Sequence, residues 1–369
     1  MYKRQGAVCQ EKDYVVETVW ANHVIPSLAY ALVENPRPGK FYPEKAKALG
    51  VPEGPLWGEL QHGKEVKLSN GKIIKPEDIP YPVNAVFNPG AIEFDGMTYL
   101  LCRMETKEGF SHLTLCKSSD GFSNWEISEK PTLEPDKKHS EEKWGLEDAR
   151  IVYMEDMGKY AITYVSFSPG GPLISLILTD DFKNFEREGP LVPPEDKDGC
   201  LFPRKFKDGY ALIHRPIIRG EGHIWISFSK DLQYWGKHKI LLPVRPGMWD
   251  CHRIGLGTPP IETEEGWLII YHGIRYAAST AIYRVGLALL DLDNPEKVIR
   301  RSKEWVFAPE MDYERIGNAV NVVFPTGAIY RKEEGKLIVY YGAADTSTCV
   351  CFGDMKEILE FLKKEKNGI

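Results

Sequence analysis

The apolar residues of this chain fall into short runs, each directly after a turn glycine. Runs of this kind, rich in β-branched and aromatic residues, predict β-strands. Five of them share one pattern: GMTYLLCRM from Gly96, GKYAITYVSF from Gly158, GYALIHRP from Gly209, GWLIIYHGI from Gly266 and GKLIVYYGAAD from Gly335. The glycines lie 62, 51, 57 and 69 residues apart. This period fits one four-stranded propeller blade per copy.

A second pattern falls in step with the first. It is a β-rich run closed by an Asp-bearing turn, in five copies: LTLCKSSDGFSNW, ISLILTDDFKNF, IWISFSKDLQYW, VGLALLDLDNP and CVCFGDM. A β-sandwich also has many short strands, but it is not expected to repeat one strand–turn pattern at this period. We therefore predict an all-β fold, a five-bladed β-propeller.

The two ends of the chain differ from the repeat. DMKEILEFLKKEK, from Asp354, has apolar residues on one face and lysines in its last turn, which predicts a C-terminal helix on the outside of the propeller. Residues before about Pro80 do not join the repeat, and PEKAKALG within them has a helical pattern. We predict a small α+β N-terminal appendage over residues 1–78 and the propeller over residues 79–369.

Composition narrows the class of function. The 369 residues include 47 basic and 53 acidic ones, well mixed, with a formal charge of −6, so no extended positive face for nucleic acid is expected. No apolar run is long enough to cross a bilayer and no signal peptide is evident, so we expect a cytoplasmic protein. The seven cysteines form neither a disulfide framework nor a CxxC metal pattern and are expected to be buried thiols.

Polar residues recur at equivalent positions of the repeat. Propeller blades bring equivalent strand ends around one mouth of the central channel, so these side chains should converge. Such a set is too polar for a packed core and indicates a pocket for a polyhydroxylated or anionic ligand. Six or seven residues past the turn glycines lie Arg103, Tyr164, Arg215, His272 and Tyr341.

A second polar set precedes the turn glycines, where Gly and Pro interrupt the strand starts. Within it, WGLEDARIV carries Asp148, the one acid at its place in the repeat, beside Glu147. Asp148 is a candidate acid, although it could instead be a structural carboxylate paired with Arg150. The other members are Asn88, Arg204, Lys205, Asp250, His252, Arg253 and Thr326.

Residues from about 80 to 355 resemble glycoside hydrolase family 130, the five-bladed-propeller mannoside phosphorylases and their hydrolase relatives. The motifs that carry the resemblance are FNPGAI, GLEDARI, LFPRKF, YALIHRP, RIGLGTPPI and NVVFPTGAIY followed by YYGAADT. The resemblance implies inverting phosphorolysis of β-1,2- or β-1,4-linked mannosides to α-mannose 1-phosphate. Asp148 would be the general acid, acting through a hydroxyl of the bound sugar.

The resemblance also implies the binding residues. No metal or cofactor is expected, with inorganic phosphate as co-substrate; the partners would be a β-mannoside oligosaccharide and phosphate, not nucleic acid or a membrane, and a homo-oligomer is possible for the family. Substrate would be held by Asn88, Arg103, His112, Asp250, Tyr341 and Asp345, and phosphate by Arg215, Arg253, His272 and Lys205.

A lone acid facing a cluster of cations is what phosphorolysis requires. An inverting hydrolase needs two carboxyl groups, one as acid and one to activate water. Phosphate is already an anionic nucleophile, and arginine holds it with bidentate donors. Two alternatives stay open: an inverting β-1,2-mannosidase in which Glu147 or Asp250 serves as base, and a non-catalytic glycan-binding propeller.

The N-terminal segment, about residues 14–78, resembles an internal piece of ribonuclease Z. The matching strings include PGKF, PEGPLWGEL and GKEVKLSNG. That family's two-zinc chemistry needs an HxHxDH stretch, which this sequence lacks. We expect the segment to be catalytically inert, and tRNA processing is not expected.

Overall fold

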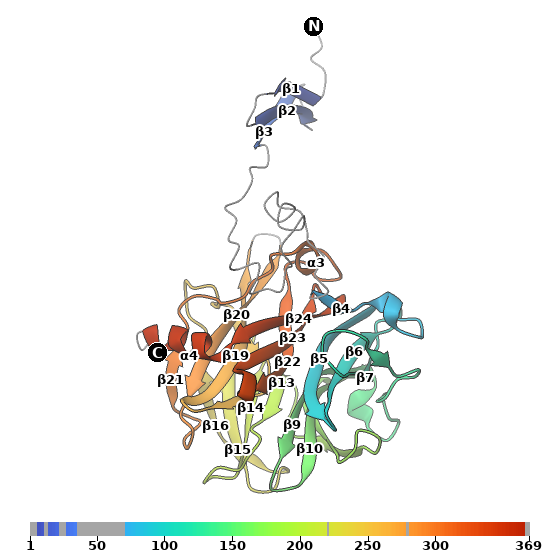
Figure 1. Ribbon diagram of the computed structural model, residues 1–369, viewed down its shortest axis with the longest axis vertical. Helices are drawn as coiled ribbons and strands as arrows, with labels where there is room; N and C mark the ends of the chain where they lie inside the picture. The colour runs from blue at the N-terminus through green and yellow to red at the C-terminus, as the bar shows by residue number, and fades with distance from the viewer. Residues whose placement is uncertain are drawn as a thin grey trace. The chain divides into compact units, whose positions relative to one another are not determined.

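The structure, a computed structural model, describes residues 6–10, 14–21, 27–34, 71–219, 221–277 and 280–365 (Figure 1). The chain divides into two compact units, Met1–Leu68 and Ser69–Ile369. In the first unit, β1 (Gly6–Gln10), β2 (Tyr14–Ala21) and β3 (Ser27–Glu34) form an antiparallel sheet in that order. The helix predicted from PEKAKALG lies outside the described residues.

The second unit is a five-bladed propeller of antiparallel sheets, as predicted. The first strands of blades 5, 1, 2, 3 and 4 contact one another in that order, and the ring closes where the first strand of blade 5 contacts two later strands of blade 4. Blade 1 is β5 (Ala85–Phe94), β6 (Met97–Glu105), β7 (Ser111–Ser118) and β8 (Glu126–Ile127), and blade 2 is β9 (Gly145–Met154), β10 (Lys159–Ser168), β11 (Gly171–Thr179) and β12 (Glu186–Pro190). Blade 3 is β13 (Asp196–Leu201), β14 (Tyr210–Pro216), β15 (Ile224–Ser229) and β16 (Trp235–Leu242). Blade 4 is β17 (Arg253–Leu256), β18 (Ile261–Thr263), β19 (Gly266–Tyr276), β20 (Ala281–Leu290) and β21 (Val298–Arg301).

Blade 5 is completed by a strand from the other end of the unit. It contains β22 (Val323–Arg331), β23 (Lys336–Ala343) and β24 (Ser347–Asp354), and β4 (Lys72–Ile74) pairs with β24. Ile74 is fully buried in a core cluster with residues of blades 1 and 5. Because β4 covers the free edge of β24, it protects a row of otherwise unpaired backbone groups. The structure thus assigns to the propeller a strand on the N-terminal side of the boundary predicted at residue 79.

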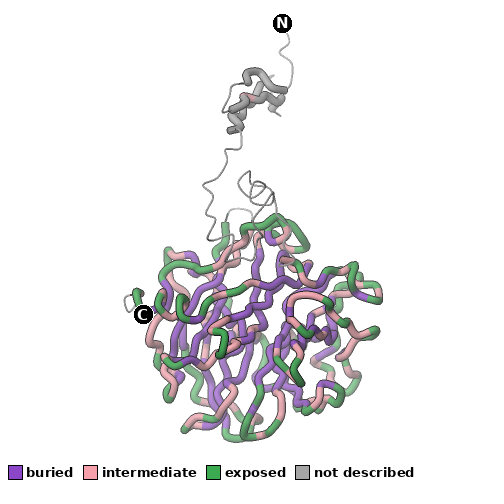
Figure 2. The backbone as a smooth tube through the Cα atoms, in the orientation of Figure 1, coloured by how far each residue is buried: buried purple, intermediate pink, exposed green. Residues whose placement is uncertain are grey.

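Figure 2 shows buried residues along the strands and exposed residues in the connections between them. The short helices are η1 (Pro76–Asp78), η2 (Ser140–Glu142), η3 (Lys332–Glu334) and α3 (Asp312–Arg315). The predicted C-terminal helix is confirmed as α4 (Met355–Lys364), which begins where Asp354 accepts a hydrogen bond from the backbone of Glu357 and packs against β20, β21 and β24. No helix in the described part of the chain is long and apolar enough to cross a membrane.

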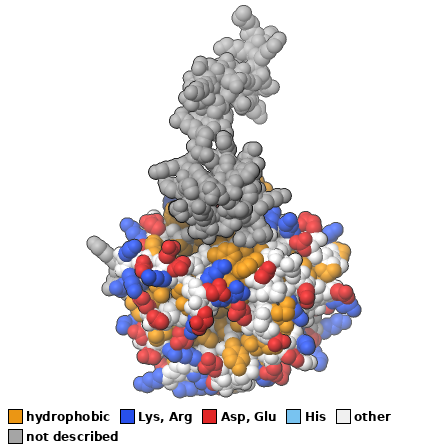
Figure 3. Space-filling model, viewed as in Figure 1, with side chains coloured by type: hydrophobic (Ala, Val, Ile, Leu, Met, Phe, Trp, Pro, Cys, Tyr) orange, Lys and Arg blue, Asp and Glu red, His pale blue; other side chains and the backbone are white. Residues whose placement is uncertain are grey.

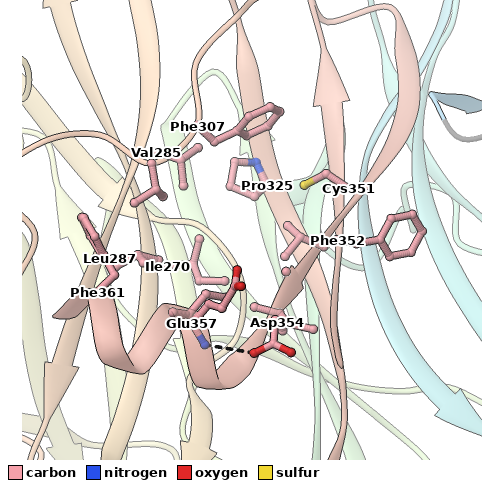
Figure 4. A pocket seen from close by; sticks show the side chains of 15 residues that line it. Ile270, Val285, Leu287, Phe307, Pro325, Cys351, Phe352, Asp354, Glu357 and Phe361 are labelled. Atoms are coloured by element: carbon pink, nitrogen blue, oxygen red, sulfur yellow. Dashed lines mark hydrogen bonds between the residues drawn. The ribbon is translucent and has the colours of Figure 1, made fainter. Parts of the chain in front are cut away.

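An apolar cavity of about 340 Å³ lies beneath α4, between blades 4 and 5 (Figure 4). Its lining includes Leu287, Phe307 and Phe361, and its carboxylates, Asp354 and Glu357, lie at the start of the helix. Such a lining offers few polar groups for a sugar or an anion. On the face in Figure 3, acidic and basic side chains are interspersed around a central apolar area, which agrees with the mixed charge of the sequence.

Candidate functional site

The first strands of four blades each carry a β-bulge near the centre of the propeller. The register skips Asn88 in β5, Asp148 in β9, Asp198 in β13 and Thr326 in β22. The first three adopt left-handed backbone angles, with φ of 47°, 52° and 55°. Asn and Asp tolerate this region better than other non-glycine residues, and a bulge redirects a side chain away from the ladder. The repeat therefore presents one polar side chain from each of these four blades at equivalent positions.

Asp148 is buried and held by side chains of the neighbouring blade. Asn88 Nδ2 donates to Asp148 Oδ1 over 2.8 Å, and Arg103 Nη1 donates to the same oxygen over 3.2 Å. The proton of a protonated Asp148 therefore belongs on Oδ2. Arg150 contacts the Asp148 backbone instead, donating from Nη1 to its carbonyl oxygen over 3.1 Å. The side chain of Asp148 is thus oriented by Asn88 and Arg103, not by the Arg150 pairing considered from the sequence.

Arg103 ties the acid to its neighbour Glu147. Its Nη2 lies 3.0 Å from Glu147 Oε1, its Nε donates to Ser111 Oγ, and its guanidinium stacks on the ring of Phe87. Glu147 also accepts from Lys197 Nζ over 2.9 Å. Burial raises the pKa of Glu147, but the charges of Lys197 and Arg103 outweigh it and hold that pKa below its usual range. Glu147 is therefore an ionised, doubly paired carboxylate and a weak base.

Asp345, after β23 of blade 5, completes the acid half of the site. Its backbone is left-handed, with φ of 50°. Burial raises the pKa of Asp345 to about 6, the positive charge of Arg103 opposes that rise, and the negative charge of Asp148 adds to it. The carboxylate thus lies within the electrostatic reach of both residues. The sugar-binding role of Asp345, implied by the family resemblance, stays a prediction.

Cationic side chains of blades 3 and 4 gather around Asp198. Arg215 Nε donates to Asp198 Oδ2 over 2.6 Å, and His272 Nε2 lies 3.5 Å from the same oxygen. Arg150 Nη2 lies 3.6 Å from Asp198 Oδ1, so Arg150 links the backbone of Asp148 to this cluster. A β-carbon at Gly222 would come within 2.9 Å of Arg215 and 3.0 Å of Arg253, so these two side chains lie side by side.

Two nitrogen atoms of this cluster are buried without a hydrogen-bond partner in the described residues: Arg215 Nη1 and His272 Nδ1. Burial lowers the pKa of His272 to about 3, against the attraction of Asp198, so the imidazole is neutral near pH 7. Leaving a buried polar group without a hydrogen bond lowers the stability of a protein, so such groups in native proteins commonly bind a ligand or water. The cluster is therefore suited to binding an anion.

Tyr283 in β20 lies between the two halves of the site. Its ring stacks on that of His272 with centroids 5.9 Å apart. Burial raises the pKa of Tyr283 to about 12, Asp345 adds to the rise, and Arg215 and Arg253 oppose it. The phenol is therefore close enough to both the acid half and the cationic half to feel their charges.

Sequence reasoning missed Asp198 and Tyr283. Asp148 was predicted to be the one acid at its place in the repeat, but Asp198, in the first strand of blade 3 (β13, residues 196–201), lies at the equivalent bulge. Comparison with the Asp148 position of the preceding repeat would have identified Asp198. Tyr283 lies in the strand after the turn-glycine run, for which no equivalent positions were compared.

Other residues expected in the site have contacts elsewhere. Asp250 is fully buried between Arg245 and Arg301, and Lys205 pairs with Asp156 over 2.8 Å. The described contacts of these two residues are thus structural. Their predicted binding roles gain no support from these contacts.

Tyr341 and His112 are likewise engaged outside the two halves of the site. The Tyr341 hydroxyl donates to Glu314 over 2.7 Å. His112 Nε2 lies 3.3 Å from the Tyr81 hydroxyl, and burial lowers the pKa of His112 to about 4.

The structure brings together Asn88, Arg103, Asp148 and Asp345 on one side and Arg215, Arg253 and His272 on the other.

Comparison with known proteins shows which family this chain is similar to. A family model of glycoside hydrolase family 130, described as beta-1,4-mannooligosaccharide phosphorylase, matches residues 59–364. A beta-1,2-mannobiose phosphorylase from Listeria innocua is 41% identical over 266 residues, which cover 70% of this chain and 72% of the relative. A solved structure of a beta-1,2-mannobiose phosphorylase from Listeria innocua in complex with beta-1,2-mannobiose superposes with a TM-score of 0.73 at 33% identity, covering 79% of this chain and 97% of that one.

Two further similarities qualify the first. A structure titled as showing that this family also contains hydrolases of beta-1,2 mannosidic linkages has a TM-score of 0.68 at 26% identity, covering 79% of this chain and 91% of that one. In addition, 79 residues, 21% of this chain, are 49% identical to a ribonuclease Z from Methanosarcina acetivorans but cover 26% of that enzyme. The chain is therefore similar to two unrelated families over different segments.

Proposed function

The chain belongs to glycoside hydrolase family 130, and we propose that it catalyses the inverting phosphorolysis of a β-mannosidic bond to give α-mannose 1-phosphate. The observation that carries the proposal is the buried cluster of the cations Arg215 and Arg253 with the neutral imidazole of His272, which Arg150 connects to the backbone of Asp148. A proton donor and an anion site are thus held by one framework of strands.

In the proposed reaction, a phosphate oxygen attacks the anomeric carbon of the terminal mannosyl unit from the α face. The bond between that carbon and the glycosidic oxygen breaks, and the departing oxygen takes the proton of Asp148, directly or through a sugar hydroxyl. Configuration inverts once, and no covalent enzyme intermediate forms. Holding phosphate against the anomeric carbon converts an encounter between two solutes into a step within one complex.

The remaining assignments follow from the two halves of the site. Asn88, Arg103 and Asp345 would bind the mannosyl unit beside Asp148, and Arg215, Arg253, His272 and Tyr283 would surround the phosphate. Relatives named for β-1,2 and β-1,4 linkages both match this chain. We propose β-1,2-mannobiose as the first substrate to test, because a relative named for it is 41% identical.

Hydrolysis is the less favoured alternative because Glu147 and Asp198 are poor bases and Asp250 is enclosed by arginines. Asp345, whose pKa burial raises to about 6, lies in the acid half of the site with Asp148. Glu147 is paired with Arg103 and Lys197, and Asp250 lies between two arginines. Burial raises the pKa of Asp198, but Arg215, His272 and Arg150 outweigh this and hold it well below its usual range. A carboxylate of such low basicity activates water weakly.

The decisive experiment follows sugar release from β-1,2- and β-1,4-mannobiose with and without inorganic phosphate. Phosphate-dependent release of α-mannose 1-phosphate, identified by ³¹P NMR, is the expected result. Equal release of free mannose in both conditions would establish a hydrolase instead. Binding of manno-oligosaccharides without turnover in either condition would favour a non-catalytic glycan-binding protein.

We also propose that the N-terminal unit is a non-catalytic appendage. The segment covers about a quarter of the ribonuclease Z that it resembles, and the HxHxDH stretch is missing from the sequence. Deleting residues 1–68 should leave phosphorolysis within about twofold of the full chain, and cleavage of a precursor tRNA by the full chain would contradict the assignment.

A further inference from the structure

The proposed phosphate site also contains a negatively charged side chain, Asp198. Asp198 is 1% exposed and projects from the bulge of β13 among Arg215, His272 and Arg150. A carboxylate in an anion site repels every guest and therefore costs affinity. This cost needs a compensating benefit, since uncharged residues could also orient the same arginines.

The carboxylate can favour binding when the bound anion carries a proton. At pH 7.5 phosphate exists mostly as a singly protonated dianion, whereas sulfate has the same charge and shape but no proton. An ionised carboxylate is a hydrogen-bond acceptor only, so it can accept from a P–OH group but opposes a bare oxygen. A site with an acceptor in place rejects an analogue that lacks the matching donor by a large factor.

His272 supplies a second acceptor of the same kind. Its Nε2 faces the negative charge of Asp198 at 3.5 Å, which favours the tautomer with the proton on Nε2. Nδ1 then carries the lone pair, and it is the buried nitrogen without a partner in the described residues. Arg215 adds the complementary group, because Nε is used by Asp198 while Nη1 is buried and unpaired.

We propose that Asp198, with His272, makes this site selective for protonated tetrahedral oxyanions: it binds hydrogen phosphate and hydrogen arsenate through their hydroxyl group and rejects sulfate. The inference deepens the proposed phosphorolysis and rests on it. Asp198 is then a specificity residue that touches the nucleophile, while the arginines provide the attraction.

The test compares anions by calorimetric binding at pH 7.5, and sulfate and monofluorophosphate are also compared as inhibitors of phosphorolysis. The probes are phosphate, arsenate, sulfate and monofluorophosphate, the last being a phosphate dianion in which fluorine replaces the hydroxyl. For the unchanged protein we expect phosphate and arsenate to bind at least about 100-fold more tightly than sulfate or monofluorophosphate. Sulfate binding as tight as phosphate binding would overturn the proposal without any variant.

The variant arm replaces Asp198→Asn, whose amide can donate to a bare oxygen. The preference for phosphate over sulfate should shrink at least about tenfold. Asp196→Asn is the matched control: it removes a carboxylate from the same strand, but Asp196 pairs with His214 and the backbone of Arg215. The control should keep the selectivity, and an equal loss in both variants would contradict a specific role for Asp198.

The outcomes separate this inference from the proposed function. Selective phosphate binding without mannoside turnover would refute phosphorolysis and leave the anion selectivity standing. If phosphorolysis occurs but the inhibition constant of sulfate is as low as the dissociation constant of phosphate, the selectivity alone is refuted. If Asp198→Asn fails to fold, as seen by circular dichroism, the sulfate and monofluorophosphate measurements on the unchanged protein decide the matter.

Discussion

Asn88 donates a 2.8 Å hydrogen bond to Asp148, and the two residues lie at equivalent bulges of adjacent blades. Both have left-handed backbone angles. The contact joins residues 60 positions apart and fixes which carboxylate oxygen is available to carry a proton. The orientation of the proposed acid thus depends on the strand geometry of two blades together.

Replacing Asp148→Asn should remove the proton donor and keep the fold, because the amide can still accept from Asn88. We expect kcat for mannobiose to fall by about 10²- to 10⁴-fold. The loss should be much smaller with 2,4-dinitrophenyl β-mannoside, whose leaving group needs no protonation. Steady-state kinetics on both substrates make the comparison, and an equal loss on both would assign Asp148 a different role.

Replacing Arg215→Lys should weaken phosphate binding. Lysine keeps the charge but loses the guanidinium fork, and with it the contact to Asp198 and the unpaired Nη1. The expected result is a rise of about 10- to 100-fold in KM for phosphate, with a smaller change in KM for mannobiose. Arg204→Lys, in the connection between β13 and β14, where Arg204 pairs with Glu262, is the control and should change neither value.

Asp345→Asn should stabilise the protein in a pH-dependent way. The pKa of Asp345 is raised by burial from 3.8 to about 6, so the folded state favours the protonated form. Its contribution to stability is present below pH 3.8 and is lost as the pH rises to about 6. At pH 7.5 the variant should therefore gain about 1–3 kcal/mol, and at pH 4 little. Urea unfolding at both pH values measures this, and an equal gain at both would exclude the charge as its cause.

Tyr341→Phe separates a structural role from a role in sugar binding. The hydroxyl of Tyr341 donates to the buried Glu314, which also accepts from the backbone of Glu310 and Met311. Its loss should lower stability by about 1.5–3 kcal/mol and leave KM for mannobiose within about twofold. A large rise in KM with unchanged stability would instead support the sugar-binding role expected from the sequence.

The sequence by itself predicted the number of blades and most of the residues that lie in the two halves of the proposed site. Turn glycines, alternating strands and a common period are local features, and equivalence between repeats carries over directly into space, as it did for Asn88 and Asp148. Asp148 and the basic residues Arg215, Arg253 and His272 were accessible for the same reason.

Tertiary structure decided what depends on partners distant in the chain. Asp250 and Tyr341 have suitable positions in the repeat, but Arg301 and Glu314 engage them from other segments. β4 closes blade 5 from the opposite end of the unit, and Asp198 gains its meaning from Arg215 and His272 around it. Strand periodicity determines the position of a residue in its blade. The charges and hydrogen-bond partners around its side chain come from residues far away along the chain.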